Sequence, residues 1–302
     1  MSELLVLTRK DYLNSIKVPN TKALANQALN YWDSFLKSRK LKEDLFILEL
    51  KQIQKNPDDT SFYQYINLFA QSLVAAKLHP RTIRTYLDRT KQYLRFFGIR
   101  IYKEDMKQFV RLPRVLKETR VPLDHKTIQL LLDNATTDMK LIMLALVSSG
   151  MRVNELLQLT KNDLTEPCVN VRAETAKTGV QRTTYFSKQV WDLLKNGAKR
   201  KGGYVFCSNY RPKKSVEELE DRFSSLRDKC KLSKRYTTSR NHTVTIHRFR
   251  AFCKTWASEK VGKDFAEGLI GHEGYLSGYY GLSDEEKLKN YNKLEPHLTF
   301  KI

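Results

Sequence analysis

A cationic cluster stands at the expected start of a helix in the segment "TVTIHRFRAFCKTWASEK", from Thr243 to Lys260. His247 and Arg250 are three residues apart, so they share one face of that helix near its N-terminus. Free backbone N–H groups and the helix dipole favour an anion at this position. The anion could be a carboxylate of the protein or a phosphodiester, and a pair at this spacing also arises by chance.

Two further cations are candidates for the same chemistry. Arg152 follows an apolar stretch, "MLALVSSGM", and must either be solvated or pair with an anion such as Glu155 or Asp163. Lys177 falls in the expected turn of a hairpin. There it is either a flexible ammonium group aimed at a ligand or an ordinary exposed lysine.

The segment "LIGHEGYLSGYYG" supplies a second histidine and three tyrosines. His272 follows a glycine, and Tyr275, Tyr279 and Tyr280 come soon after it. In a loop, each of these tyrosines could pack against the core. On a helix, Tyr279 and Tyr280 would point about 100° apart, so only one of them can face a given ligand.

The overall charge favours a polyanionic partner. The 302 residues include 54 Lys and Arg against 33 Asp and Glu, which gives a net charge of +21. Such a charge predicts binding to nucleic acid or attraction to an anionic membrane surface. The membrane is disfavoured because the sequence shows no long apolar span, signal peptide or lipidation motif.

Neither a metal nor another cofactor is expected. The cysteines show no CxxC spacing, which disfavours a zinc knuckle or a dithiol redox site; they are Cys168, Cys207, Cys230 and Cys253. A metal nuclease is disfavoured because the sequence shows no acidic cluster. His242 and His247 in "HTVTIH" could be read as a ligand pair, but the Thr/Val alternation predicts a strand, on which they would point to opposite faces.

The first third of the chain predicts helices, one of which presents a basic face. Apolar residues recur at helical spacing after Thr60, the expected N-cap, and again in "RTIRTYLDRTKQYLRFFG", which stops at Gly98. The polar face of this second helix carries the candidate DNA contacts Arg81, Arg84, Lys91 and Arg95. A merely solvated basic face is the alternative.

The composition divides the chain into segments. Two prolines, mixed charge and the lack of a period predict a linker over residues 113–127, with the domain break near residue 117. An all-α domain over residues 56–112 precedes it, after a helical extension over residues 1–55. The pattern that follows is α+β: a mainly helical domain over residues 128–302 with a small antiparallel sheet.

The sheet is expected from "CVNVRA" and "RTTYFS", two segments of β composition joined by a turn that contains Gly179. "GGYVFCS" is a further strand candidate. Helices are predicted for "MKLIMLALVSSG", which should stop at Gly150, for "RVNELLQLT" and within "GKDFAEGLIGHEG". Ser215 with Glu218 three residues later is a capping-box pattern and predicts another helix start.

Five segments together resemble the tyrosine recombinase (phage integrase) family, in the family's order and at about its spacing. They are "SSGMRVNELLQLT", "AKTGVQR", "HRFRAFCKTWA", "LIGHEG" and "GYYGLSDEEKLKNY". The resemblance runs from roughly Lys117 to the end and is greatest to archaeal integrases. "LHPRTIRTYLDRTKQYLRFF" is in addition similar to the family's core-binding domain. Residues 1–55 would then be an arm that binds DNA or part of that domain.

The resemblance implies a site-specific DNA recombinase. Such an enzyme cuts and rejoins strands through a 3′-phosphotyrosine intermediate, and so integrates or excises a mobile element. The implied partners are double-stranded DNA with a specific recombination site and further copies of the chain, as a homo-tetramer on paired DNA. The implied location is cytoplasmic, with association to the nucleoid when DNA is bound, and without a cofactor or a membrane partner.

The resemblance also implies roles for the cations. Arg152 and Arg250 would clamp the non-bridging oxygens of the scissile phosphate, which planar guanidinium groups suit well. His247 and His272 would donate to the same phosphate or transfer protons. Lys177 would be the general acid that protonates the leaving 5′ oxygen.

The nucleophile implied by the family is a tyrosine near residue 280. Tyr279 and Tyr280 follow His272 by a shorter interval than the family usually has, which leaves both open. The interval slightly favours Tyr280. The flanking pattern of the archaeal relatives favours Tyr279, which we take as the nucleophile with Tyr280 as the alternative.

Two rival functions share some of these features. A type IB topoisomerase would use the same chemistry but would relax DNA without a cognate site. A non-catalytic DNA-binding protein would need the positive charge but not the series of arginine, lysine, histidine and tyrosine residues.

Overall fold

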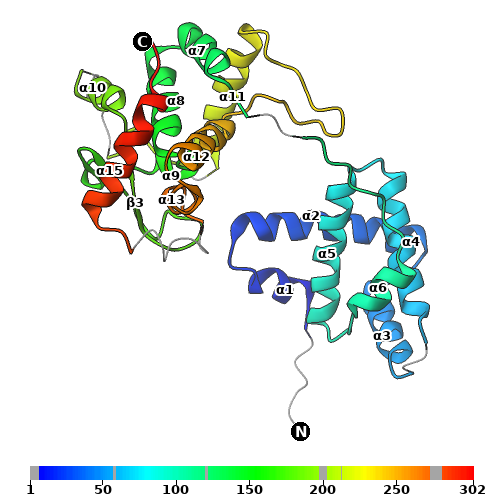
Figure 1. Ribbon diagram of the computed structural model, residues 1–302. Coiled ribbons are helices and arrows are strands. Elements are labelled where there is room, and N and C mark those ends of the chain that lie inside the picture. Colours follow the sequence, from blue (N-terminus) through cyan, green and yellow to red (C-terminus); the bar gives the residue numbers. More distant parts are fainter. Residues whose placement is uncertain (1–6, 57–58, 120–121, 197–202, 212, 273–280) are drawn as a thin grey trace. The chain divides into compact units, whose positions relative to one another are not determined.

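The computed structural model describes residues 7–56, 59–119, 122–196, 203–211, 213–272 and 281–302. It forms two compact units, Met1–Lys117 and Glu118–Ile302 (Figure 1). The division falls inside the linker expected over residues 113–127. The roles expected for the segments on either side of it remain predictions.

The first unit is helical throughout its described part. Its helices are α1 (Arg9–Ser15), α2 (Pro19–Ser38), α3 (Glu43–Ile53), α4 (Ser61–Ala75), α5 (Pro80–Phe96) and α6 (Lys103–Phe109). Helices α1 to α3 share one apolar core with α4 and α5: Tyr12 packs edge-on against Tyr93 with ring centroids 5.2 Å apart, and Trp32 packs against Phe69 at 4.9 Å. The described residues before α4 are therefore built into the same folded unit as α4 and α5.

Helix α5 forms where the sequence predicts it. Pro80 occupies its first turn, where a missing backbone N–H costs nothing, and His79 Nδ1 accepts from the backbone N–H of Arg81 at 3.2 Å. Its apolar residues point inward, and the helix ends before Gly98, which has a φ of +87°. The basic residues of α5 consequently lie on its outer face.

The second unit combines helices with a small sheet, which confirms the α+β prediction. Its helices are α7 (His125–Asn134), α8 (Thr137–Ser149), α9 (Val153–Leu157), α10 (Lys188–Asn196), α11 (Lys214–Lys229), α12 (Arg248–Lys260), α13 (Lys263–Leu269) and α15 (Asp284–Leu294), with 3-10 turns η1 (Lys161–Asp163) and η2 (Glu295–Leu298). The antiparallel sheet has the order β1 (Leu164–Thr165), β2 (Cys168–Val171) and β3 (Arg182–Tyr185), with Val169 opposite Thr184.

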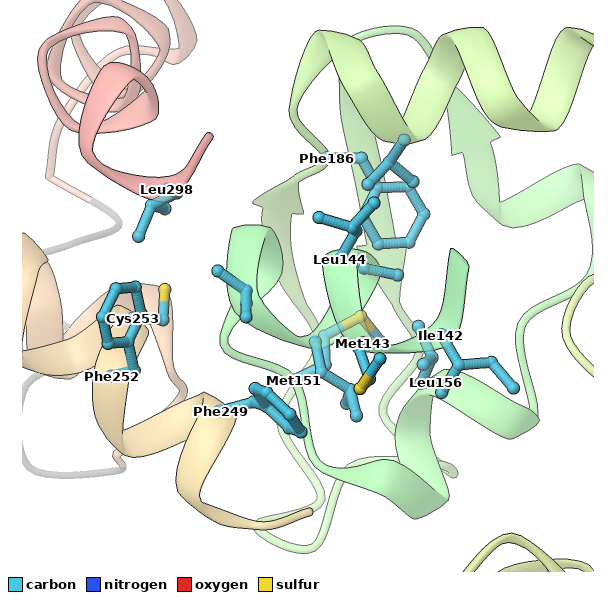
Figure 2. Close-up of a cluster of buried hydrophobic side chains, with 14 of the residues drawn as sticks. Ile142, Met143, Leu144, Met151, Leu156, Phe186, Phe249, Phe252, Cys253 and Leu298 are labelled. Carbon is cyan, nitrogen blue, oxygen red and sulfur yellow. The ribbon is translucent and has the colours of Figure 1, made fainter. Parts of the chain in front are cut away.

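Helix α8 is the centre of this unit, because it is apolar on every side and packs against several elements. Figure 2 shows Ile142, Met143 and Leu144 of α8 among the surrounding core side chains, with Phe249 and Phe252 of α12 nearby. The Thr136 side chain caps its start, and Gly150, with a φ of +62°, ends it as predicted. The turn at Gly150 is thus packed against core side chains, including Cys253 and Ile270.

Three local predictions are wrong. "GGYVFCS" forms no strand in its described part, where Tyr204 only makes a single bridge with Thr160. "HTVTIH" likewise makes only one bridge, between His242 and Arg235, and its last residue already begins the turn of α12. The capping box at Ser215 is absent because α11 begins earlier, at Lys214, and the carboxylate of Glu218 pairs with Arg211 at 2.7 Å instead.

Within the described residues, the structure shows no helix both long and apolar enough to span a membrane. The same part of the chain contains no group of three or more His, Cys, Asp or Glu side chains arranged to hold a metal ion. None of the four cysteines, all of which lie in the described part of the chain, forms a disulfide.

Candidate active site

Arg152 is the N-cap residue of helix α9 and lies two residues after Gly150. Its backbone N–H donates to Glu155 Oε2 at 3.0 Å, and its Nη1 donates to Glu155 Oε1 at 2.8 Å. The side chain of Arg152 is 22% exposed, whereas that of Glu155 is 1% exposed. One buried carboxylate therefore fixes both the backbone and the guanidinium of Arg152 while leaving part of the guanidinium accessible. Of the two partners considered from the sequence, the structure selects Glu155.

Arg250 lies in the first turn of α12 and is buried, with 6% of its surface exposed. Its Nη1 donates to the carbonyl oxygen of Gly150 at 2.7 Å, but its buried Nη2 has no hydrogen-bond partner in the described part of the chain. Burial, together with the positive charge of Arg152, lowers the pKa of Arg250 to about 9. A buried cation without a carboxylate partner is costly, so this position favours an incoming anion.

Glu155 stays ionised despite its burial. Burial alone would raise the pKa of its carboxyl group, but the charge of Arg182 and hydrogen bonds from Arg182 and Arg152 outweigh that effect, and the net pKa is lowered. The carboxylate is shared between those two arginines. Arg250 makes no ion pair with the described carboxylates, so the cluster keeps an excess of positive charge beside Gly150.

His272 follows α13 and is held by a second buried carboxylate. Its Nδ1 contacts Glu267 Oε2, and its backbone N–H donates to the Glu267 carbonyl oxygen at 2.9 Å. Lys254 Nζ also contacts Glu267, 2.6 Å from Oε1. Burial alone would raise the pKa of Glu267, but the hydrogen bond and charge of Lys254, together with His272, lower it. Glu267 thus holds the Nδ1 side of the ring.

The other two cations of the predicted site lie on the surface. His247 is exposed at the N-cap of α12, one turn before the buried Arg250. Lys177 is exposed in the turn between β2 and β3 and makes no ion pair with the described residues. Both side chains are therefore accessible to solvent.

The candidate nucleophiles lie outside the described residues. Tyr275, Tyr279 and Tyr280 belong to the segment 273–280, which begins directly after His272. The choice between Tyr279 and Tyr280 therefore remains a prediction from the sequence.

The structure adds two residues that the sequence reasoning missed. Arg182, the first residue of β3, has a fully buried side chain and pairs with Glu155. Glu267 is the buried partner of His272. A signal was available only for Glu267, a charged residue in the otherwise apolar run "FAEGLIG", where it needs a partner. Arg182 stands in the polar stretch "VQRTT", which gives no such signal.

The candidate DNA contacts on α5 are accessible to different degrees. Arg81, Arg84 and Arg95 are exposed, although Arg84 Nη2 donates to the Pro113 carbonyl oxygen at 3.2 Å and Arg95 Nη2 donates to another carbonyl oxygen at 2.8 Å. Lys91 is half-buried and pairs with Asp88 at 2.6 Å. Three of the four guanidinium and ammonium groups therefore already have a protein partner, and Arg81 is the most open of the predicted contacts.

Comparison with solved structures shows a shared fold. Lambda integrase residues 75–356, solved as a dimer bound to a COC′ core site, gives a TM-score of 0.54 at 18% identity over 83% of this chain and 96% of that chain. A lambda integrase tetramer bound to a Holliday junction gives 0.53 at 17% identity over 88% and 82%. The Tn1549 transposon integrase (residues 82–397), in complex with circular intermediate DNA, gives 0.52 at 15% identity over 87% and 97%.

Sequence comparison identifies the family. A search of curated proteins gave no match. The sequence profile of the phage integrase family matches residues 122–277, which is just over half of the chain and includes Arg152, Lys177, His247, Arg250 and His272. The chain therefore belongs to the phage integrase family and is a site-specific tyrosine recombinase that acts on DNA.

Proposed function

We propose that the scissile phosphate of a DNA strand binds between Arg152, Arg250, His247 and His272, and that cleavage there leaves a 3′-phosphotyrosine bond. The single observation that supports this most strongly is the Nη2 group of Arg250, which is buried without a hydrogen-bond partner in the described part of the chain. A non-bridging phosphate oxygen would accept that hydrogen bond and would also neutralise a cation that the protein leaves without a carboxylate.

The cations would act most strongly in the transition state. Negative charge accumulates on phosphorus-bound oxygens during displacement, and donors fixed in advance stabilise it without reorganisation. Arg152 is fixed by Glu155 and Arg250 by the Gly150 carbonyl oxygen. His272, with Nδ1 held at Glu267, would present its other ring nitrogen to the phosphate.

Lys177 and a tyrosine would carry out the proton and bond exchange. The phenolic oxygen of Tyr279, or alternatively Tyr280, would attack phosphorus: its O–P bond forms, the phenolic proton passes to His247 or His272, and the P–O5′ bond breaks. The leaving 5′ oxygen would take its proton from Lys177, whose exposed position in the β2–β3 turn leaves it able to reach that atom. Religation would reverse these steps with a new 5′ hydroxyl group.

The helical unit would bind the DNA flanking that phosphate. Arg81, Arg84, Lys91 and Arg95 would contact the backbone from the outer face of α5. We assign residues 1–55 to this core-binding domain because α1 to α3 share its apolar core. Residues 56–112 complete this domain, and residues 113–127 link it to the catalytic domain over residues 128–302.

The full reaction would be carried out by a tetramer on paired DNA. Association with the nucleoid would follow from DNA binding.

The proposal is tested by trapping the covalent intermediate. A labelled suicide substrate, in which the strand beyond the cut is lost, should give a protein–DNA band on a denaturing gel with the wild-type protein. The band should disappear for Tyr279→Phe and persist for Tyr280→Phe, because the change removes only the phenolic oxygen. Tyr291→Phe is a matched control, since that buried hydroxyl donates to the Ser148 carbonyl oxygen.

Each result has a distinct meaning. Loss of the band with Tyr280→Phe alone would reassign the nucleophile and leave the proposed reaction intact. A band from both Phe variants would place the nucleophile elsewhere, and no band from the wild-type protein on any cognate site would refute the proposed reaction. Relaxation of a supercoiled plasmid without a cognate site would instead indicate a topoisomerase.

A further inference from the structure

Arg182 is a buried arginine to which the proposed reaction assigns no step. It is the first residue of β3, and its side chain is 0% exposed. Its guanidinium forms a two-point ion pair with Glu155: Nη2 lies 2.6 Å from Oε2 and Nη1 lies 3.4 Å from Oε1. This geometry uses the planar fork that distinguishes arginine from lysine.

The ion pair leads directly to Arg152. The same two Glu155 oxygens accept hydrogen bonds from the Arg152 side chain at 2.8 Å and from its backbone N–H at 3.0 Å. Arg182 therefore determines how the Glu155 carboxylate is turned, and that carboxylate determines where the Arg152 guanidinium lies. Without Arg182, Glu155 would be free to rotate toward Arg152 alone.

A second set of contacts leads to His272. Arg182 Nε donates to the Leu269 carbonyl oxygen at the end of α13, at 3.3 Å. Gly271 packs on the same guanidinium so closely that a Cβ atom there would lie 2.8 Å from Arg182 Nε and 2.9 Å from Cζ. Gly271 has a φ of +76° and is followed by His272. The backbone just before His272 is therefore held by packing and a hydrogen bond to Arg182.

Stability alone does not explain a fully buried ion pair, because apolar residues of similar volume are often as stabilising or more so. We propose that Arg182 is a positioning residue that holds Arg152 and His272 in one fixed geometry around the scissile phosphate. This inference rests on the proposed function of those two residues. A displacement of about 1 Å in a positioned group can slow a reaction about 10²-fold.

The first test replaces Arg182 by lysine, which keeps the charge beside Glu155 but cannot make both contacts of the fork and the Leu269 hydrogen bond. At saturating protein concentration, Arg182→Lys should form the covalent adduct about 10²-fold more slowly than the wild type, with an unchanged dissociation constant for DNA. Arg227→Lys is the matched control: that arginine is also buried in this unit, but its partners, Ser224 and Asp228, lie on its own helix. Cleavage by Arg182→Lys at the wild-type rate would overturn the inference.

A second variant covers the case in which Arg182→Lys does not fold. The double change Arg182→Met and Glu155→Met replaces the ion pair by apolar side chains and should restore folding. Slow cleavage by this folded variant supports positioning by the Arg182–Glu155 pair, whereas wild-type cleavage refutes it.

A measurement without cleavage separates this inference from the proposed reaction. Inorganic phosphate should raise the melting temperature of the wild-type protein, and the rise should be smaller for Arg182→Lys. If the wild type forms no covalent adduct, the proposed reaction fails and this comparison decides the role of Arg182. An equal rise in melting temperature for the wild type and Arg182→Lys would overturn the inference about Arg182.

Discussion

Replacing Arg250 by methionine should make the protein more stable and abolish cleavage. Arg250 is 6% exposed, and its Nη2 has no partner among the described residues. The fall of its pKa from 12.5 to about 9 corresponds to roughly 5 kcal/mol against the charged form in the folded protein. Because pH 7 lies below this pKa, Arg250 is charged at pH 7, and its buried charge destabilises the folded state by that amount.

Methionine removes the buried charge but leaves the Gly150 carbonyl oxygen without its donor. Losing that hydrogen bond costs about 1–3 kcal/mol. Subtracting this loss from the roughly 5 kcal/mol gained by removing the charge leaves an increase in the unfolding free energy of roughly 2 kcal/mol or more. Urea unfolding at pH 7, in a buffer free of phosphate and sulfate, measures it. Arg227→Met is the control, because Arg227 Nη2 donates to Ser224 Oγ at 2.6 Å and its loss should destabilise.

Arg250→Lys keeps the positive charge but removes the planar guanidinium group that can donate two parallel hydrogen bonds. It should bind a long DNA duplex almost as well as the wild type but cleave about 10²–10³-fold more slowly, as when one oxyanion donor is removed. The reasoning is refuted if Arg250→Met is less stable than the wild type, since the arginine would then serve the fold. Equal cleavage by Arg250→Lys and the wild type would remove Arg250 from the site.

Three further outcomes follow from the charges of the protein. DNA affinity should fall steeply with salt, with a log–log slope of about −0.9 for each phosphate neutralised; a flat titration by filter binding would exclude phosphate contacts as the main contribution. EDTA should leave the first strand cut on a short synthetic site unchanged, because Arg152, Arg250 and Lys177 are proposed to supply the positive charge; loss of that cut would contradict the mechanism. The pKa of Glu155 is below its ordinary 4.5 in the folded protein, so its contribution to stability is complete above that value and is lost as the pH falls through the folded pKa. Urea unfolding of the wild type and Glu155→Gln should differ by a constant amount near neutral pH, and a difference that grows on acidification would contradict this assignment.

The sequence predicted those parts of the fold that depend on local patterns. The end of α8 at Gly150 follows from a glycine after an apolar run, and the β2–β3 hairpin follows from two segments of β composition around Gly179. The strand expected in "GGYVFCS" does not form, because β composition alone does not supply a neighbouring strand for pairing.

The sequence indicates the residue types of the candidate site but not their surroundings in the folded protein. Arg152 and Arg250 could be named from their segments, but only the folded chain shows that one has a buried carboxylate partner and the other lacks one. Arg182 was not recognised because strand alternation does not tell which face of a strand a lone charged residue takes. Glu267 was missed because its partners, Lys254 and His272, come from α12 and the end of α13.

The two glycines that end α8 and α13 bring the turns before Arg152 and His272 into close contact. A Cβ atom on Gly150 would lie 2.9 Å from Ile270 Cγ2, and one on Gly271 would lie 2.8 Å from the Arg182 side chain. The turn at Gly150 therefore packs directly against Ile270, the residue before Gly271. Neither glycine has room for a methyl group. The close packing of the two turns gives Arg152 and His272 a rigid spacing in the free protein. That rigidity is the condition under which fixed donors stabilise a transition state better than water does.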